Sequence, residues 1–136
     1  MDVLRRALAS LVEILRRLID QDVPVTEVPG LRSSVEGRWW TAANAAGNDA
    51  DVEAIRGIDP DLVEKESLLL GIAFCGVFDA LPEGGRALVV GHSLTNEAAV
   101  LGLATEVIDP VGRGEGVLVI EDAGRFRVRP IERDSA

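Results

Sequence analysis

The sequence contains very few of the residue types that build covalent, metal and redox sites. Its 136 residues include one cysteine, one histidine, one methionine and no tyrosine, and aromatic residues make up 4%. Cys75 cannot form an intrachain disulfide, and because it lies in an apolar run we expect a buried structural thiol. His92 and Cys75 are too few to build a zinc site, and no clustered carboxylates favour a hard cation. We therefore expect neither a metal nor a cofactor.

Basic residues and long apolar runs are also scarce. Lys and Arg number 14 against 23 Asp and Glu, a formal net charge of -9 that opposes binding to nucleic acid and to anionic membranes. Glu13, Arg16 and Arg17 interrupt the apolar residues near the N-terminus too early for a signal peptide. No segment reaches the ~18 apolar residues of a membrane span. We expect a cytoplasmic protein without nucleic-acid or membrane partners.

The helical segments stand out by their spacing. The length favours a single domain over residues 1–136. Leucines at alternating intervals of four and three predict an amphipathic first helix, at positions 4, 8, 11, 15 and 18. A second helix should begin with Asp59 as N-cap and Pro60 at its first position, and end before Pro82. Between them, residues 31–58 show no sustained period, which predicts a long surface segment with one short helix near residues 51–55.

The remaining segments predict strands around a third helix. Ala87–Val90 is short and apolar, which is typical of a strand covered on both faces. Because it lies between two predicted helices, the second of them in TNEAAVLGLATEVI, we interpret it as part of a parallel-sheet unit. A final hairpin should turn near residues 122–124, with Phe126 and Val128 alternating with three arginines.

Residues 91–95 read GHSLT and differ from the nucleophile-elbow pattern G-x-S-x-G only at Thr95. A serine nucleophile requires a base, which in these enzymes is a histidine from a later loop. His92 is the only histidine, and as the neighbour of Ser93 on an extended strand its side chain points the other way. A serine hydrolase that uses Ser93 is thus the least favoured alternative.

A second interpretation of the same residues is an anion site. At the carboxyl end of a parallel strand, His92 would face an anion held by free N–H groups at the start of the next helix. The alternative is that His92 only forms hydrogen bonds at that helix start.

The sequence resembles a known family over nearly its whole length. ALVVGHSLTNEAAVLGL followed by GEGVLVIEDAGRFRVRPI is similar to the C-terminal half of the histidine phosphatase superfamily, the phosphoglycerate mutase-like fold. LRRALASLVEIL resembles the family's helix with the pattern S-x-L-x-R-A-x-x-T, which places Arg6 in the phosphate pocket. VPGLRSSVEGRW resembles L-x-E-x-x-x-G-x-W, and KES resembles an acid–serine pair. The resemblance implies a three-layer α/β/α fold with a mainly parallel sheet, truncated at the N-terminus and ending in a β-hairpin.

The resemblance also implies the roles of individual residues. His92 matches the second family histidine, which contacts the transferring phosphoryl group, and Ser93 lies next to the same phosphate. The family nucleophile, a histidine in an R-H-G motif, has no counterpart in this sequence. At the position of the family's acid the chain carries Ser33, so Glu36 is the possible substitute. We therefore expect a residual pocket for phosphate or a phosphorylated small molecule, built from Arg6, His92 and Ser93.

Without its nucleophile such a domain should not catalyse phosphoryl transfer through phosphohistidine. One alternative is a piece of an active phosphomonoesterase or mutase-like enzyme whose R-H-G segment lies upstream. The family's first strand is central in its sheet, so its absence would leave neighbouring strands unpaired. Another polypeptide could supply that strand, the remaining strands could close ranks, or two copies could pair. We expect a homodimer.

Overall fold

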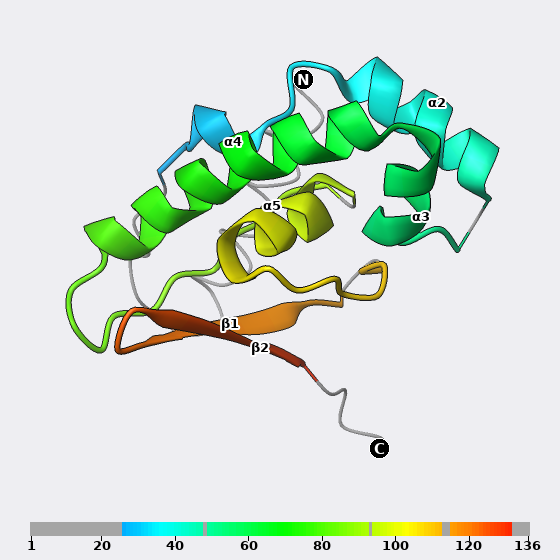
Figure 1. Cartoon of the computed structure of the whole chain (residues 1–136). Helices are drawn as coiled ribbons and strands as arrows, with labels where there is room; N and C mark the ends of the chain where they lie inside the picture. The colour runs from blue at the N-terminus through cyan, green and yellow to red at the C-terminus, as the bar shows by residue number, and fades with distance from the viewer. Residues whose placement is uncertain (1–25, 48, 93, 113–114, 132–136) are drawn as a thin grey trace, which may run out of the picture.

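The computed structural model describes residues 26–47, 49–92, 94–112 and 115–131. This part of the chain forms a layer of helices over a two-stranded antiparallel hairpin (Figure 1). In chain order the elements are η1 (Pro29–Leu31), α2 (Glu36–Ala46), α3 (Val52–Ile58), α4 (Pro60–Ala80), α5 (Thr95–Ala104), β1 (Val117–Asp122) and β2 (Arg125–Pro130). The mixed α and β content and the C-terminal hairpin agree with the predictions.

The long helix α4 begins and ends where the sequence predicts. The Asp59 side chain accepts a hydrogen bond from the Leu62 N–H at 3.2 Å, Pro60 takes the first helical position, and Asp61 lies in the first turn. These are the N-cap, proline and dipole preferences of a helix start. The helix ends at Ala80, two residues before Pro82.

Helices α4 and α5 touch backbone to backbone. A Cβ on Gly71 would lie 2.6 Å from the carbonyl carbon of Gly102, and a Cβ on Gly102 would overlap the carbonyl oxygen of Ser67. Only glycine fits at both positions, so the two helices pack more closely than side chains would allow. The core lies around this contact and between α4, α2 and α3. Its apolar residues include Trp39, Ala42, Val52, Ile55, Leu62, Val63, Leu70 and Ala98.

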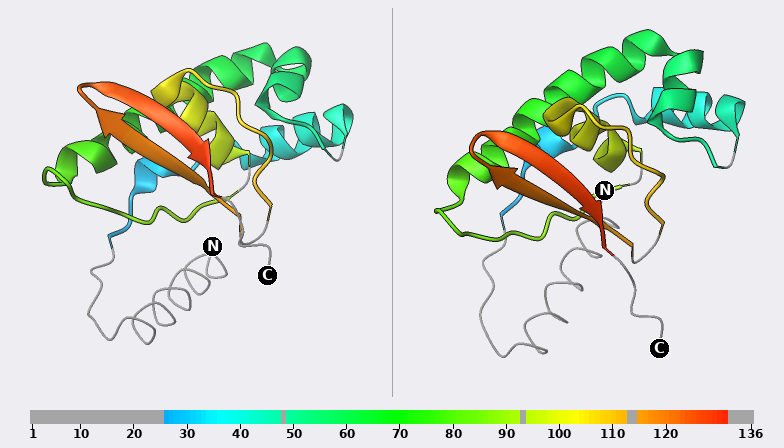
Figure 2. Two further views of the ribbon diagram at one scale, coloured as in Figure 1. Left: turned by 90° about the horizontal axis from the view of Figure 1, so that it is seen from below. Right: turned by 60° about the horizontal axis from the view of Figure 1, so that its bottom comes forward.

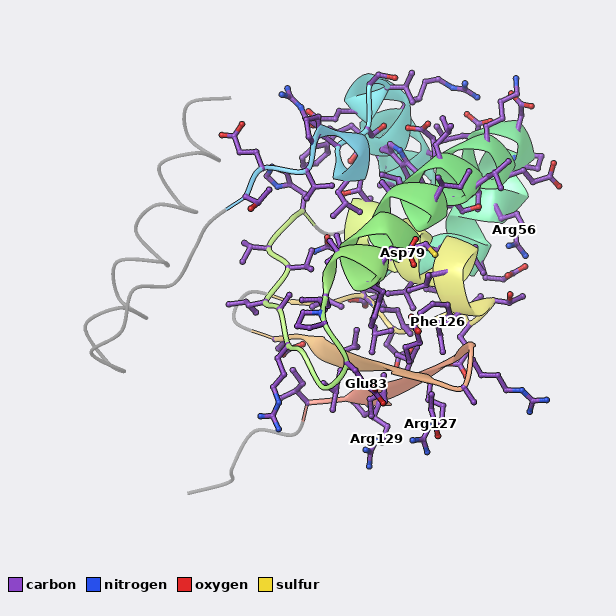
Figure 3. All side chains as sticks on the ribbon, turned by 90° about the vertical axis from the view of Figure 1, so that its left-hand side faces the viewer. Arg56, Asp79, Glu83, Phe126, Arg127 and Arg129 are labelled. Carbon is purple, nitrogen blue, oxygen red and sulfur yellow. The ribbon has the colours of Figure 1, made fainter. Side chains whose placement is uncertain are left out.

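The hairpin confirms its predicted turn and alternation. Val119 pairs with Val128, and the two-residue turn Ala123–Gly124 has φ of +51° and +76°, the left-handed conformation that a tight hairpin needs. Phe126 points towards the helices and packs against Phe78 of α4, with the ring centroids 5.1 Å apart. Arg127 and Arg129 point away from the helices (Figure 3). The hairpin thus covers the lower side of the helical layer.

The prediction for residues 31–58 is wrong in part. The short helix near residues 51–55 is confirmed as α3, but α2 is a second helix of 11 residues where a surface segment was expected. Its buried side is formed by Trp39 and Ala42, with Ala43 and Ala46 partly buried beside them. The spacing of these four residues is helical, but three are alanines, and alanine carries a weak apolar signal.

The prediction that Ala87–Val90 is a buried strand is also wrong. The segment connects α4 to α5 without secondary structure (Figure 2). All four of its side chains are exposed. No strand among the described residues lies beside it to complete a hydrogen-bond ladder, so the described part shows neither a parallel sheet nor a three-layer arrangement. A strand needs neighbours to satisfy its backbone groups, and residue type alone does not supply them.

The predicted first helix, residues 4–18, lies outside the described residues. The third predicted helix is confirmed as α5 but is shorter, because Thr105 adopts a left-handed φ of +57°. Cys75 is half-buried rather than buried. None of the helices in the described part is both long and apolar enough to span a bilayer.

Candidate functional site

His92 lies on the turn that leads into α5. Its carbonyl oxygen accepts hydrogen bonds from the Thr95 hydroxyl and from the Asn96 N–H, both at 3.0 Å. Its side chain is exposed. The turn therefore fixes the backbone of His92 against the start of a ten-residue helix and presents the imidazole to solvent.

The start of α5 already holds one acidic group. The buried Glu97 side chain accepts a hydrogen bond from the Leu94 N–H, and Leu94 adopts a left-handed φ of +74°. This is the return half of a capping box, in which an acid at the third helical position bonds to the backbone before the helix. Among the described residues the Thr95 N–H has no hydrogen-bond partner.

Gly91 allows the turn to fold back on α5. A Cβ at this position would overlap the Asn96 side-chain oxygen. That atom is the tip of a rotatable side chain, so a larger residue could be accommodated by a change in the Asn96 rotamer. The close approach brings the Asn96 amide beside the backbone just before His92.

A second polar group lies in the interior between α2 and α4. The Ser33 hydroxyl donates a hydrogen bond to Glu66 and accepts from the Trp39 indole N–H at 3.2 Å and from the Val35 N–H at 3.1 Å. The exposed fractions of Ser33 and Glu66 are 5% and 7%. Sequence reasoning noted Ser33 and the Glu66–Ser67 pair separately. The structure brings Ser33 and Glu66 together, and both side chains are almost completely buried.

Glu36 lies in a shallow hollow on the surface. The hollow has a volume of about 500 Å³ and is lined by Pro29, Arg32, Ser33, Ser34, Glu36 and Gly37. The Arg32 guanidinium approaches the Glu36 carboxylate to 3.9 Å, and both side chains are largely exposed. His92 does not line this hollow.

The structure thus tests only part of the predicted site. His92 and Glu36 are described and exposed, and the hollow beside Glu36 is not lined by His92. Arg6 and Ser93 lie outside the described residues. The Glu97 cap was missed, although an acid three residues after a turn and before an apolar run is a known helix-start pattern. The Ser33–Glu66 hydrogen bond was missed because the two residues are 33 positions apart in the chain.

Comparisons with known proteins add no identification. No protein-family model, no curated protein and no solved structure matches this chain. Within the described ranges, no group of three or more His, Cys, Asp or Glu side chains is placed to hold a metal ion. The candidate site must therefore be judged on the residues around His92.

Proposed function

We propose that this chain is a non-catalytic phosphate-binding domain of the histidine phosphatase type. The observation that carries the proposal is the exposed imidazole of His92 on the turn into α5, where the His92 carbonyl oxygen is hydrogen-bonded to the first turn of the helix. A helix N-terminus attracts anions through its free amides, and an imidazole can donate a hydrogen bond to a phosphate oxygen. In this proposal Arg6 and Ser93 complete the pocket, as the family resemblance implies.

The same proposal covers the finer features of the fold. The helical layer and the hairpin would be parts of a three-layer phosphoglycerate mutase-like domain. The Glu97 carboxylate neutralises part of the positive end of α5, which weakens the attraction of that helix for an anion. We therefore expect affinity for inorganic phosphate in the millimolar range.

Phosphate binding can be measured directly at His92. Because this is the only histidine in the chain, its ring signals in an NMR spectrum need no assignment. Titration with inorganic phosphate should shift the His92 ring signals and the Thr95 and Asn96 amide signals along one saturating curve. The hairpin arginines serve as the internal control, because an unspecific effect would shift residues 125–129 equally. Unchanged His92 signals at millimolar phosphate, with sodium chloride at matched ionic strength as reference, would refute the proposal.

Catalysis is expected to be at background level. A phosphohistidine mechanism needs a second histidine as nucleophile, and the chain has only His92. Hydrolysis of an aryl phosphate by the wild-type chain should equal hydrolysis by the His92→Ala variant. Turnover that is lost in that variant would show that the chain is an active phosphatase.

A further inference from the structure

The connection between α4 and α5 has an unpaired backbone and exposed apolar side chains. Within the described residues, Arg86–Gly91 form no backbone hydrogen bond. The exposed fraction is 66% for Leu88 and 38% for both Val89 and Val90. Consecutive exposed apolar side chains, with backbone groups that have no backbone partner among the described residues, form a template for strand addition.

The charges around this segment favour a particular partner. Two copies of a chain with a net charge of -9 repel each other wherever their acidic surfaces approach. Residues 86–92, RALVVGH, contain no acidic residue and begin with Arg86. Two copies can therefore meet here without opposing carboxylates. We infer that Ala87–Gly91 pairs with the same segment of a second copy as an antiparallel β-ladder.

A register centred on Val89 suits both side-chain size and chemistry. Val89 lies opposite its own copy, Leu88 opposite Val90, and Ala87 opposite Gly91, so every pair is apolar or small. In this register Arg86 of each copy lies opposite His92 of the other. The second copy thus supplies a guanidinium beside each imidazole, where a bound anion would bridge the two groups.

The anion bridge between Arg86 and His92 rests on the proposed function, whereas the β-ladder does not. A ladder of five residues is far smaller than the roughly 1,200–2,000 Å² interfaces of stable complexes. The Kd of the dimer should therefore be about 1 µM or weaker.

Sedimentation equilibrium of the full chain tests the ladder. The wild-type average mass should rise from 14.5 kDa toward twice that value as the concentration increases from about 1 µM to about 1 mM. Val89→Pro removes a backbone donor, and Leu88→Lys places a charge on each strand edge, so both variants should remain monomeric. Both positions are exposed in the monomer, which leaves its core intact.

The matched control is Leu68→Lys on α4, whose side chain is equally exposed. It introduces the same charge elsewhere on the surface and should dimerise like the wild type. A wild-type chain that stays monomeric at the highest concentration, or a Val89→Pro variant that still dimerises, would overturn the inference.

Disulfide trapping tests the register. In a Cys75→Ser background, Val89→Cys should form a disulfide dimer under mild oxidation, because the two thiols face each other. Ala87→Cys should not, because the two positions are about 13 Å apart along antiparallel strands and disulfides need a Cα separation below about 7 Å. Equal trapping at both positions would exclude this ladder.

Inorganic phosphate separates the ladder from the anion bridge. If both the ladder and the bridge are present, phosphate should strengthen dimerisation of the wild type. The Arg86→Ala variant should lose this effect but still dimerise in the absence of phosphate. A dimer that does not respond to phosphate would retain the ladder and refute the bridge. If phosphate shifts the His92 ring signals in the monomeric Val89→Pro variant, phosphate binding does not require the dimer. That result would support the proposed function independently of the ladder.

Discussion

At the scale of single residues, Ser33 shows how one hydroxyl can join two helices. It links Glu66 of α4 to the indole of Trp39 on α2, with all three groups buried. The same hydroxyl also accepts from the Val35 N–H, so its removal would leave three partners without this hydrogen bond. The contribution of this hydroxyl to folding stability is therefore greatest in the buried interior, where water cannot replace its hydrogen bonds.

Ser33→Ala should lower the free energy of unfolding by about 1–3 kcal/mol, the cost of unsatisfied buried polar groups. Urea unfolding followed by tryptophan fluorescence measures this, and Trp40→Phe as background leaves the buried Trp39 as the only indole, because Trp40 is 69% exposed. Glu66→Gln keeps an oxygen acceptor for Ser33 and should cost less. Ser34→Ala, at an exposed neighbour, should stay within about 0.5 kcal/mol of the background. A Ser33→Ala variant as stable as the Ser34→Ala control would show that the network contributes nothing.

For the candidate site, the sequence could predict which residues to consider but not how they are placed relative to one another. A lone histidine between a glycine and a helix start is visible in the sequence, and its position on the turn into α5 agrees with the structure. Its distance from Glu36 in the fold was not predictable, because the two residues belong to segments whose relative placement depends on packing through α4. The capping role of Glu97 was not predicted, because the residue is followed by an apolar run that was interpreted only as part of a helix.

At the scale of secondary-structure elements, the start of α4 is stabilised by an ion pair. The Arg38 guanidinium donates to Asp59 at 2.8 and 2.9 Å from Nη2 and at 3.3 Å from Nε. These hydrogen bonds lower the pKa of Asp59; partial burial opposes the shift, and the hydrogen bond from the Leu62 N–H supports it. The Asp59 carboxylate therefore connects α2 to the N-terminus of α4 in its charged form.

Because the pKa of Asp59 is lowered in the folded state, the stabilisation is complete above the ordinary aspartate value of 3.8 and is lost as the pH falls through the folded value. Asp59→Asn keeps a side-chain oxygen for the Leu62 N–H but loses the charge. Its urea midpoint should lie below that of the wild type at pH 7, and the difference should shrink at pH values below about 4. Asp61→Asn, at an exposed position on the same turn, should change the midpoint less. A difference between wild type and Asp59→Asn that is constant with pH would contradict the assignment.

Elements with local signals were predicted well. The cap and proline of α4, the turn glycine of the hairpin and the alternation of β2 depend on neighbours in the chain, and all three are confirmed. The alanine-rich α2 was missed because three of its four buried or partly buried residues are alanines, which carry a weak apolar signal. Ala87–Val90 has the composition of a strand, but strand formation also depends on a partner that composition does not reveal.

At the scale of the whole molecule, the described part buries its apolar residues mainly within one helical layer. The hairpin covers that layer through Phe126, while Leu68, Leu69 and Ile72 on the outer side of α4 are exposed. The outer side of the hairpin carries arginines on an otherwise acidic chain. The molecule therefore presents surfaces of different character on opposite sides, and the unpaired segment before His92 differs from both.

The contact between Gly71 and Gly102 has a consequence for motion in the molecule. Two helices separated only by hydrogen atoms at their crossing cannot slide past each other without a backbone collision, so α4 and α5 should move as one body. Since the His92 carbonyl oxygen is hydrogen-bonded to the first turn of α5, the backbone of His92 should move together with that helix. Any rearrangement that accompanies binding would then be confined to the side chain of His92 and to the chain that precedes it.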